Sequence, residues 1–205
     1  MFTPRHSPHP SHPATGPDDL YDTKPPWDID RPQAAFVALA EAGSVRGRVL
    51  DIGCGTGEHA LIAAGMGDEA VGVDQSAQAL ELAERKATER GLEVRFIRHD
   101  ACNLAELDEH FDTVLDCGLF HIFTVDARDA YVDSLRAVVR PGGRYFMLGF
   151  SDAQPGDWGP QRLSRNDITN AFADGWQIDS IEPSIIDITV DPHQIAAWLV
   201  QLTRK

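Results

Sequence analysis

Residues 49–57, VLDIGCGTG, carry the strongest structural signal in this chain. An apolar run typical of a buried strand is followed by three glycines at alternate positions, Gly53, Gly55 and Gly57. Glycine permits backbone angles and close approaches that a side chain would block, so the pattern predicts a strand that turns sharply into a helix. At the carboxyl edge of a parallel sheet, such a turn is where a doubly wound fold binds its ligand. The alternative is a glycine-rich turn without a ligand.

A second signal is Asp74, which follows the apolar run AVGV of residues 70–73. A carboxylate at the end of a second strand can accept hydrogen bonds from both hydroxyls of a ribose, so we expect a nucleoside ligand. The dinucleotide fingerprint GxGxxG would need a third glycine where this chain has Glu58. This departure argues against a nucleotide-dependent oxidoreductase, which stays open as a less favoured alternative.

The pattern D-x-G-x-G-x-G, which begins at Asp51, resembles motif I of the class I S-adenosylmethionine (SAM) methyltransferases, and Asp74 resembles that family's ribose-binding carboxylate. The resemblance implies an α/β fold with a doubly wound, seven-stranded, mostly parallel sheet, an antiparallel last strand and helices on both faces. It also implies SAM as the cofactor. The cofactor contacts that it implies within the sheet region come from Asp51, Gly53, Cys54, Gly55, Gly57, Asp74, Gln75, Asp100, Ala101 and Asp116.

Composition limits the partners. The chain has 205 residues and a formal net charge of −14, and an acidic protein repels polyphosphate, so we expect no nucleic-acid substrate. No apolar run approaches the length of a membrane span. The three cysteines and the absence of an apolar leader indicate a cytoplasmic protein. No metal site is predicted. Residues 1–17 are rich in proline and histidine, and we expect them to form a disordered tail before a single domain over residues 18–205. Metal binding by these histidines is the alternative.

Residues 18–33, DDLYDTKPPWDIDRPQ, are predicted to form a lid. Three prolines stiffen this segment, and its aromatic side chains can dock on the domain. A Trp27 ring facing the sulfonium of the cofactor would contribute a cation–π contact of about 0.5–2 kcal/mol. The alternative is that Trp27 only covers the edge of the core.

The stretch PPWDIDRPQ is similar to the PWDIGRPQ signature of a bacterial group of small-molecule methyltransferases. This group is related to the thiopurine methyltransferases and includes the mycobacterial heterocyclic-toxin methyltransferases. Its N-terminal segment closes over the cofactor, which implies that Trp27 and Arg31 contact the cofactor near its methionine moiety. Asp30 stands where the group has glycine, and aspartate tolerates a positive φ less well.

The remaining pattern alternates helices and strands, as in a parallel doubly wound sheet. Helices are expected over 33–43, 58–66, 77–90 and 124–139 and after a capping Ser164, and strands over 48–52, 69–74, 93–98, 111–118 and 144–150. Residues 140–143, RPGG, are expected to form a tight turn, and residues 175–190 a strand broken at Pro183. Residues 195–203 could form a helix or a strand, and the family resemblance favours an antiparallel last strand.

Three stretches after the strands bear on the reaction. In the family, the acid at Asp100 binds the adenine amino group and the Ala101 amide faces a ring nitrogen, although Asp100 could equally cap the following turn. The sequence after Asp116 lacks the proline motifs of nucleic-acid base methyltransferases, which again argues against nucleic acid. His121 is predicted to act as a base beside the transferred methyl group, with a packing role as the alternative.

The acceptor is predicted to contact Tyr21, Phe120, Trp158 and Arg162, with surface packing as the alternative for Trp158 and Arg162. We therefore expect a methyltransferase that transfers the methyl group of SAM to an oxygen, nitrogen or sulfur atom of a small aromatic or heterocyclic molecule. A catalytically silent SAM-binding regulator is the main alternative.

Overall fold

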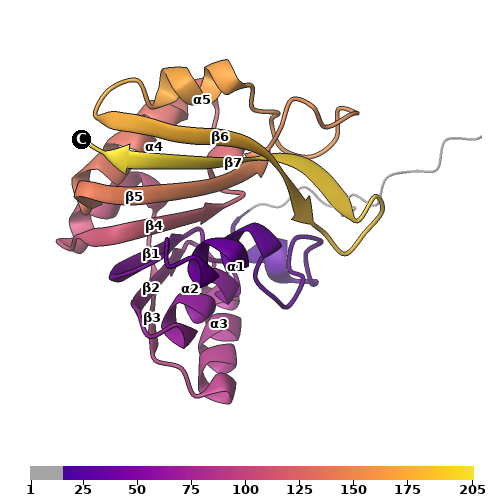
Figure 1. The fold of residues 1–205 in the computed structure, drawn as a ribbon. Coiled ribbons are helices and arrows are strands. Elements are labelled where there is room, and N and C mark those ends of the chain that lie inside the picture. Colours follow the sequence, from indigo (N-terminus) through magenta and orange to yellow (C-terminus); the bar gives the residue numbers. More distant parts are fainter. Residues whose placement is uncertain (1–15) are drawn as a thin grey trace, which may run out of the picture.

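The computed structural model describes residues 16–205, so nearly all of the predicted N-terminal tail, residues 1–17, lies outside the described residues. A single seven-stranded sheet runs through the described part in the order β3-β2-β1-β4-β5-β7-β6 (Figure 1). Its strands are β1 (Arg48–Ile52), β2 (Glu69–Asp74), β3 (Val94–Arg98), β4 (Phe111–Cys117), β5 (Val139–Phe150), β6 (Trp176–Asp187) and β7 (Gln194–Arg204). The helices are α1 (Ala34–Glu41), α2 (Glu58–Gly65), α3 (Ala77–Arg90), α4 (Val125–Val138) and α5 (Arg165–Ala171).

The strand directions confirm the expected fold. The five strands β3, β2, β1, β4 and β5 run parallel to one another, whereas β7 is antiparallel to both β5 and β6. The carboxyl ends of β1, β2 and β4 consequently meet at one edge of the sheet. This is the edge at which doubly wound folds bind ligands.

Alternating side chains of the strands fill two cores, one on each face of the sheet. On one face, Val49 of β1 and Phe146 of β5 pack with residues of α1 and α2. On the other face, Leu50 of β1 and Tyr145 of β5 pack with residues of α4 and α5. Because both faces are covered, the central strands are mainly apolar, as the sequence pattern predicts, with Asp51 and Asp116 near their carboxyl ends as exceptions.

Two local predictions differ from the structure. Residues 175–190 were expected to break at Pro183, but β6 continues through Pro183, which pairs with Trp198 of β7. Since β6 lies at the edge of the sheet, a proline there can turn its missing N–H away from the neighbouring strand. The RPGG stretch belongs to the start of β5, where the pairing with β4 shifts register between Phe111 and Thr113, so it forms an irregularity within the strand.

The helix ends follow the sequence closely. Ser76 caps α3 by accepting a hydrogen bond from the Ala79 amide (3.1 Å), and Gly91 ends that helix in the left-handed conformation. Ser164 and Asp167 form the predicted capping box at the start of α5. Within residues 16–205, no helix is both long enough and apolar enough to cross a membrane.

Candidate active site

The glycine loop between β1 and α2 has the predicted geometry. Gly53, Gly55 and Gly57 adopt positive φ values of 66°, 53° and 84°. A Cβ atom at Gly57 would lie 2.9 Å from both the Cβ of Ala83 and the ring of Phe96, so a larger residue would displace α3 and β3. Glycine is therefore required here by both backbone angle and close packing.

Three carboxylates gather at the ends of β1, β2 and β4. Burial raises the pKa of Asp51 to about 8, and the negative charges of Asp74 and Asp116 add to this increase. Burial also raises the pKa values of Asp74 and Asp116. Close carboxylates that lose solvent in this way make a site in which a positively charged ligand is favoured.

Asp51 has an unsatisfied oxygen. Its Oδ2 atom accepts a hydrogen bond from the Ala60 amide at 3.0 Å, whereas its Oδ1 atom is buried and has no hydrogen-bond partner within residues 16–205. A buried acceptor without a partner costs about 1–3 kcal/mol. A donor group on a bound ligand would remove this cost.

Asp74, at the end of β2, is half-buried and binds the glycine loop. Its Oδ2 atom accepts a hydrogen bond from the Gly55 amide (2.8 Å) and its Oδ1 atom one from the Ser76 amide (2.9 Å). Each oxygen keeps a second lone pair, so the predicted bonds to ribose hydroxyls remain compatible with this geometry. Gln75 follows Asp74 with an exposed side chain, and its carbonyl accepts a bond from Arg98.

Asp100 and Ala101 lie beside this position, because the amide of His99 bonds to the Asp74 carbonyl at 3.0 Å. The Asp100 carboxylate caps the short helix Ala101–Leu107 through the Cys102 amide (2.9 Å), so the capping alternative is confirmed. Contact with adenine stays a prediction, and the two roles are compatible.

Asp116 differs from the other two carboxylates. Its side chain is fully buried and accepts hydrogen bonds from the hydroxyls of Tyr131 (2.6 Å) and Tyr145 (2.7 Å). It also accepts bonds from the amides of Leu119 (2.8 Å) and Phe120 (3.1 Å). The protein itself occupies both oxygens of Asp116, so the predicted contact of this side chain with the cofactor gains no support from its position and stays a prediction.

The predicted lid covers the glycine loop. It begins with a short helix, Asp18–Tyr21, in which Asp18 accepts a hydrogen bond from the Ser76 hydroxyl at 2.9 Å. The Tyr21 hydroxyl lies 2.7 Å from the position that a Cβ of Gly55 would occupy. Burial raises the pKa of Tyr21 and the nearby charge of Asp74 raises it further, so the hydroxyl stays protonated at neutral pH. Tyr21, which we predicted to contact the acceptor, thus lies against the cofactor loop.

The end of the lid, residues 27–33, forms a strap to the hairpin between β6 and β7. The Arg31 guanidinium pairs with the Asp187 carboxylate at 2.8 Å, and the Gln33 side chain bonds both backbone groups of Asp187 (2.8 and 2.9 Å). Asp30 has a φ of 56°, so this position does require the left-handed conformation, which aspartate adopts more readily than most residues. Trp27 is 48% exposed, so it does not cover the core edge, and its contact with the cofactor stays a prediction.

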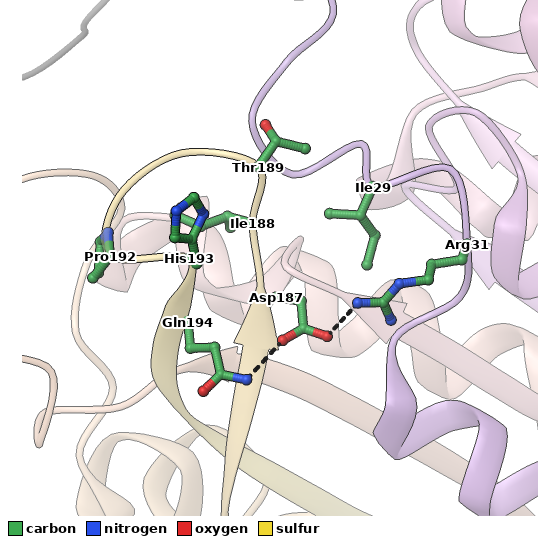
Figure 2. A pocket seen from close by; sticks show the side chains of 8 residues that line it. All are labelled: Ile29, Arg31, Asp187, Ile188, Thr189, Pro192, His193 and Gln194. Carbon is green, nitrogen blue, oxygen red and sulfur yellow. Dashed lines mark hydrogen bonds and ion pairs between the residues drawn. The ribbon is translucent and has the colours of Figure 1, made fainter.

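A pocket of about 430 Å³ lies between the strap and this hairpin (Figure 2). In the figure, Arg31 and Gln194 point toward Asp187 from opposite sides, and Ile29 lies above them. In this structure Arg31 therefore contacts the hairpin, and the implied contact of Arg31 with the cofactor has no support from its position.

His121 is buried at the end of β4, and its Nδ1 atom accepts a hydrogen bond from the Phe150 amide at 3.1 Å. Burial, and to a smaller extent the positive charge of Arg162, lower the pKa of His121 to about 3. The imidazole is thus neutral and carries its proton on Nε2. The base role stays a prediction, and it would require the bond to Phe150 to break.

The other predicted acceptor residues make packing contacts. Phe120 is completely buried and packs against Tyr131 and Phe172, so its position gives no support to the predicted contact with the acceptor, which stays a prediction. Arg162 donates to the carbonyls of Trp158 and Pro160 (both 2.8 Å) and lies over the Trp158 ring. It therefore fixes the loop after β5, on which Trp158 is half-buried.

Comparison with known proteins agrees with this geometry. Residues 49–143 match a family model described as a methyltransferase domain. The chain is 37% identical over 174 residues to the 2-heptyl-1-hydroxyquinolin-4(1H)-one methyltransferase of Mycobacteroides abscessus, which covers 83% of this chain and 77% of that protein. A solved structure described as "Conversion of a Disulfide Bond into a Thioacetal Group during Echinomycin Biosynthesis" has a TM-score of 0.84 and 37% identity, covering 92% of this chain and 91% of that one. The chain belongs to the class I SAM-dependent methyltransferases.

A more distant structure shows the same fold with the cofactor present. The magnesium protoporphyrin IX methyltransferase of Synechocystis with bound SAM has a TM-score of 0.66 and 21% identity, covering 84% of this chain and 77% of that one. SAM is the cofactor of this methyltransferase. The residues of this chain fit SAM. The ammonium group of SAM can donate a hydrogen bond to the free Oδ1 atom of Asp51, and the positive charges of SAM can be compensated by the buried carboxylates.

Sequence reasoning missed three residues that organise the site: Gln33, Lys86 and Asp187. Gln33 and Asp187 are joined by paired hydrogen bonds, and Lys86 of α3 reaches the glycine loop and the lid. The only local signal was the position of Gln33 at the end of the PWDIDRPQ stretch. The other two contacts join residues that are distant in sequence, so no motif indicates them.

Proposed function

We propose that this methyltransferase methylates an acidic hydroxyl group on a small, hydrophobic heterocycle. The relative from Mycobacteroides abscessus is named for a substrate of this kind, a hydroxyquinolinone with a heptyl chain. The proposal also rests on the chemistry that the acceptor side of this chain can perform.

The state of His121 carries the proposal. Its one available lone pair accepts the Phe150 amide, and its low pKa keeps the ring neutral. A ring in this state is a poor base, so we assign no proton removal to it. An acceptor that is already ionised near neutral pH needs no base, and a hydroxyl attached to an electron-poor heterocycle has this property.

Exposed apolar groups support a hydrophobic acceptor. Ile122 and Val125 follow β4 at the carboxyl edge and are 55% and 68% exposed. The pocket beside Arg31 has apolar walls from Ile29 and Ile188. Its volume of about 430 Å³ lies within the range of about 300–1,000 Å³ that is typical of small-molecule sites.

The chain's own contribution is binding and orientation. When bound, SAM supplies a methyl group on a positively charged sulfur that leaves as a neutral thioether. Asp51 and Asp74 would hold the donor through its charged and hydroxyl groups, and Tyr21 would exclude water above the glycine loop. Holding the two reactants in line without water accounts for most of the rate enhancement that such a site can provide.

The dependence of kcat/KM on pH tests this proposal. The probes are 2-heptyl-1-hydroxyquinolin-4(1H)-one, the same molecule without the N-hydroxyl group, and a series of hydroxyquinolines of graded acidity. We expect kcat/KM to rise with pH along each acceptor's own ionisation and then to level off. A pH profile that is the same for every acceptor would indicate an ionising group of the enzyme and would overturn the proposal.

We further propose that the enzyme works in the cytoplasm and does not act on nucleic acid. Cys54, Cys102 and Cys117 are all free thiols, which suits a reducing compartment. The net charge of −14 opposes the approach of polyphosphate. Incubation with labelled SAM and total RNA or DNA should give no labelled nucleic acid, and labelled nucleic acid would contradict this exclusion.

A further inference from the structure

Lys86 lies at the junction of the glycine loop and the lid. Its side chain is only 16% exposed, and its Nζ atom donates to the Thr56 hydroxyl at 2.8 Å. The same atom pairs with Glu58, the first residue of α2, at 2.9 Å. The ammonium group of α3 therefore holds both the end of the glycine loop and the start of the helix that follows it.

The opposite side of the ammonium faces the lid. The Nζ atom lies 3.7 Å from the carboxylates of both Asp28 and Asp30. Asp28 is the more enclosed of the two, with a side chain that is 9% exposed. One cation thus connects two segments, residues 28–30 and residues 56–58, that are not adjacent in the sequence.

The neighbouring ion pairs show which carboxylate depends on Lys86. Glu58 keeps two hydrogen bonds from Arg90, both 2.8 Å long, and Asp30 keeps an ion pair with Lys24. Within the described part of the chain, Lys86 is the only cation within ion-pair distance of Asp28, and the charge of Lys24 acts on Asp28 only from farther away. Loss of the Lys86 ammonium would therefore leave Asp28 as a nearly buried carboxylate without an ion pair, and this part of the lid would move toward solvent.

The other end of the strap does not depend on Lys86. Gln33 and Arg31 tie it to Asp187 in the β6–β7 hairpin, and the Gln33 amide bonds to His59 of α2 at 3.2 Å. The hairpin contacts of the strap, and the bond from the Thr189 amide to the Pro26 carbonyl (2.8 Å) just before it, should consequently stay in place when the contact of residues 28–30 with Lys86 is lost. A change at Lys86 therefore tests the lid at the cofactor and leaves its attachment to the rest of the sheet unchanged.

We propose that Lys86 is a positioning residue that links closure of the lid to the glycine loop, so that the affinity for the cofactor depends on its ammonium group. Lys86 acts through Asp28 on the lid and through Thr56 on the loop. The proposal adds to the methyltransferase activity a determinant of cofactor retention on α3, outside the glycine motif and outside the lid.

The test compares Lys86→Met with Lys86→Arg and with Lys24→Met, which removes an exposed lid lysine whose ion pair is with Asp30. Calorimetry measures the affinity for S-adenosylhomocysteine, and hydrogen exchange measures protection of residues 18–33 with that ligand bound. We expect Lys86→Met to weaken binding about tenfold or more, which is within the usual range for coupled residues. It should raise KM for SAM with little change in kcat at saturating SAM, and it should lower protection of the lid.

Lys86→Arg should recover most of the affinity, because it keeps the cation, and Lys24→Met should change the affinity by less than about twofold, as expected for an exposed pair. In a double-mutant cycle, Asp28→Asn should add little to Lys86→Met. Thermal unfolding of every variant establishes that each one is folded. Wild-type affinity in Lys86→Met, an equal loss in Lys24→Met, or a loss of affinity with unchanged protection of the lid would each overturn the proposal.

Discussion

On the β1–β2 side of the sheet edge, Asp51 keeps a buried oxygen without a protein partner, whereas on the β4 side Asp116 has both oxygens occupied by protein donors. The same contrast extends to the neighbours. Asp74 retains lone pairs toward the site, but His121 and Arg162 direct their polar atoms to backbone groups. Polar groups in one half of this edge thus remain available to a ligand, whereas those in the other half are paired within the protein.

This contrast separates two kinds of recognition. In the half that carries the glycine loop, buried carboxylates lack positively charged partners, so binding of a cationic cofactor lowers the free energy of this half. In the acceptor half, the polar side chains already have protein hydrogen-bond partners, so this half can select its substrate by shape and apolar contact. This arrangement suits an enzyme whose acceptor ionises without help, since no acceptor-side group then has to change its protonation.

The largest expected effect is on the fold and comes from Asp116→Ala. This change leaves the hydroxyls of Tyr131 and Tyr145 and two amides without an acceptor in the core. Each unpaired buried group costs about 1–3 kcal/mol, so the free energy of unfolding should fall by at least about 3 kcal/mol. Urea denaturation measures this loss, with Tyr131→Phe as a milder control. Wild-type stability together with weak cofactor binding would place Asp116 on the ligand-dependent half instead.

The next effect is on cofactor affinity and comes from Asp51→Asn. Loss of the charge opposite the cofactor ammonium should weaken S-adenosylhomocysteine binding by about 10- to 100-fold, the usual range for a hydrogen bond to a charged group. Asp112→Asn is a matched control, because Asp112 lies at the opposite end of β4 and bonds Arg140. Calorimetry that gives the same affinity for both variants would contradict the cofactor role of Asp51.

The same variant tests the electrostatics of the unliganded site. Burial raises the pKa of Asp51 from 3.8 to about 8, so the folded state holds this proton more tightly than the unfolded state does. The resulting stability is fully present below pH 3.8 and is lost as the pH rises toward about 8. The unliganded wild type should therefore lose more stability across this interval than Asp51→Asn does. Parallel stability curves for the two proteins would show that Asp51 is already ionised.

Sequence patterns predicted the half of the edge with the glycine loop well, because its structure depends on short sequence motifs. The loop from Gly53 to Gly57 requires positive φ values, and only a run of glycines meets this need, so the motif is visible in nine residues. The position of Asp74 at the end of β2 follows from strand periodicity alone. The parallel α/β class and most helix ends follow from the same local rules, whereas the seven-stranded sheet with an antiparallel last strand was implied by the family resemblance.

The acceptor half could not be predicted to the same depth. Periodicity places His121 after β4, but it does not show that its Nδ1 atom bonds an amide at the end of β5. Phe120 is adjacent to His121 but packs against Tyr131 and Phe172, whereas His121 packs against Phe150. Pro183 was interpreted as a strand break because the sequence does not reveal that β6 is an edge strand. These outcomes depend on contacts between distant segments, which a single sequence does not encode in any local pattern.

A smaller effect is expected from His121→Ala on the reaction itself. A general base contributes about 100- to 10,000-fold to a rate, whereas a packing histidine contributes much less. We expect kcat with an ionised acceptor to fall by less than about tenfold, and by the same factor at each pH, because only packing beside Phe150 is lost. Steady-state kinetics on folded protein measures this ratio. A loss that grows for less acidic acceptors would restore His121 as the base and make the acceptor half chemically active.

The smallest effect is expected from Arg31→Ala, in the strap beside the β6–β7 hairpin. Its ion pair with Asp187 is partly exposed, and such pairs contribute about 0–1 kcal/mol, so the melting temperature should change little. Because Gln33 still ties the strap to the hairpin, the affinity for S-adenosylhomocysteine should change by less than about threefold. The change should instead raise KM for the acceptor, since Arg31 lines the pocket beside the hairpin. A larger loss of cofactor affinity than of acceptor affinity would assign Arg31 to the cofactor half, as the resemblance to the PWDIGRPQ group implies.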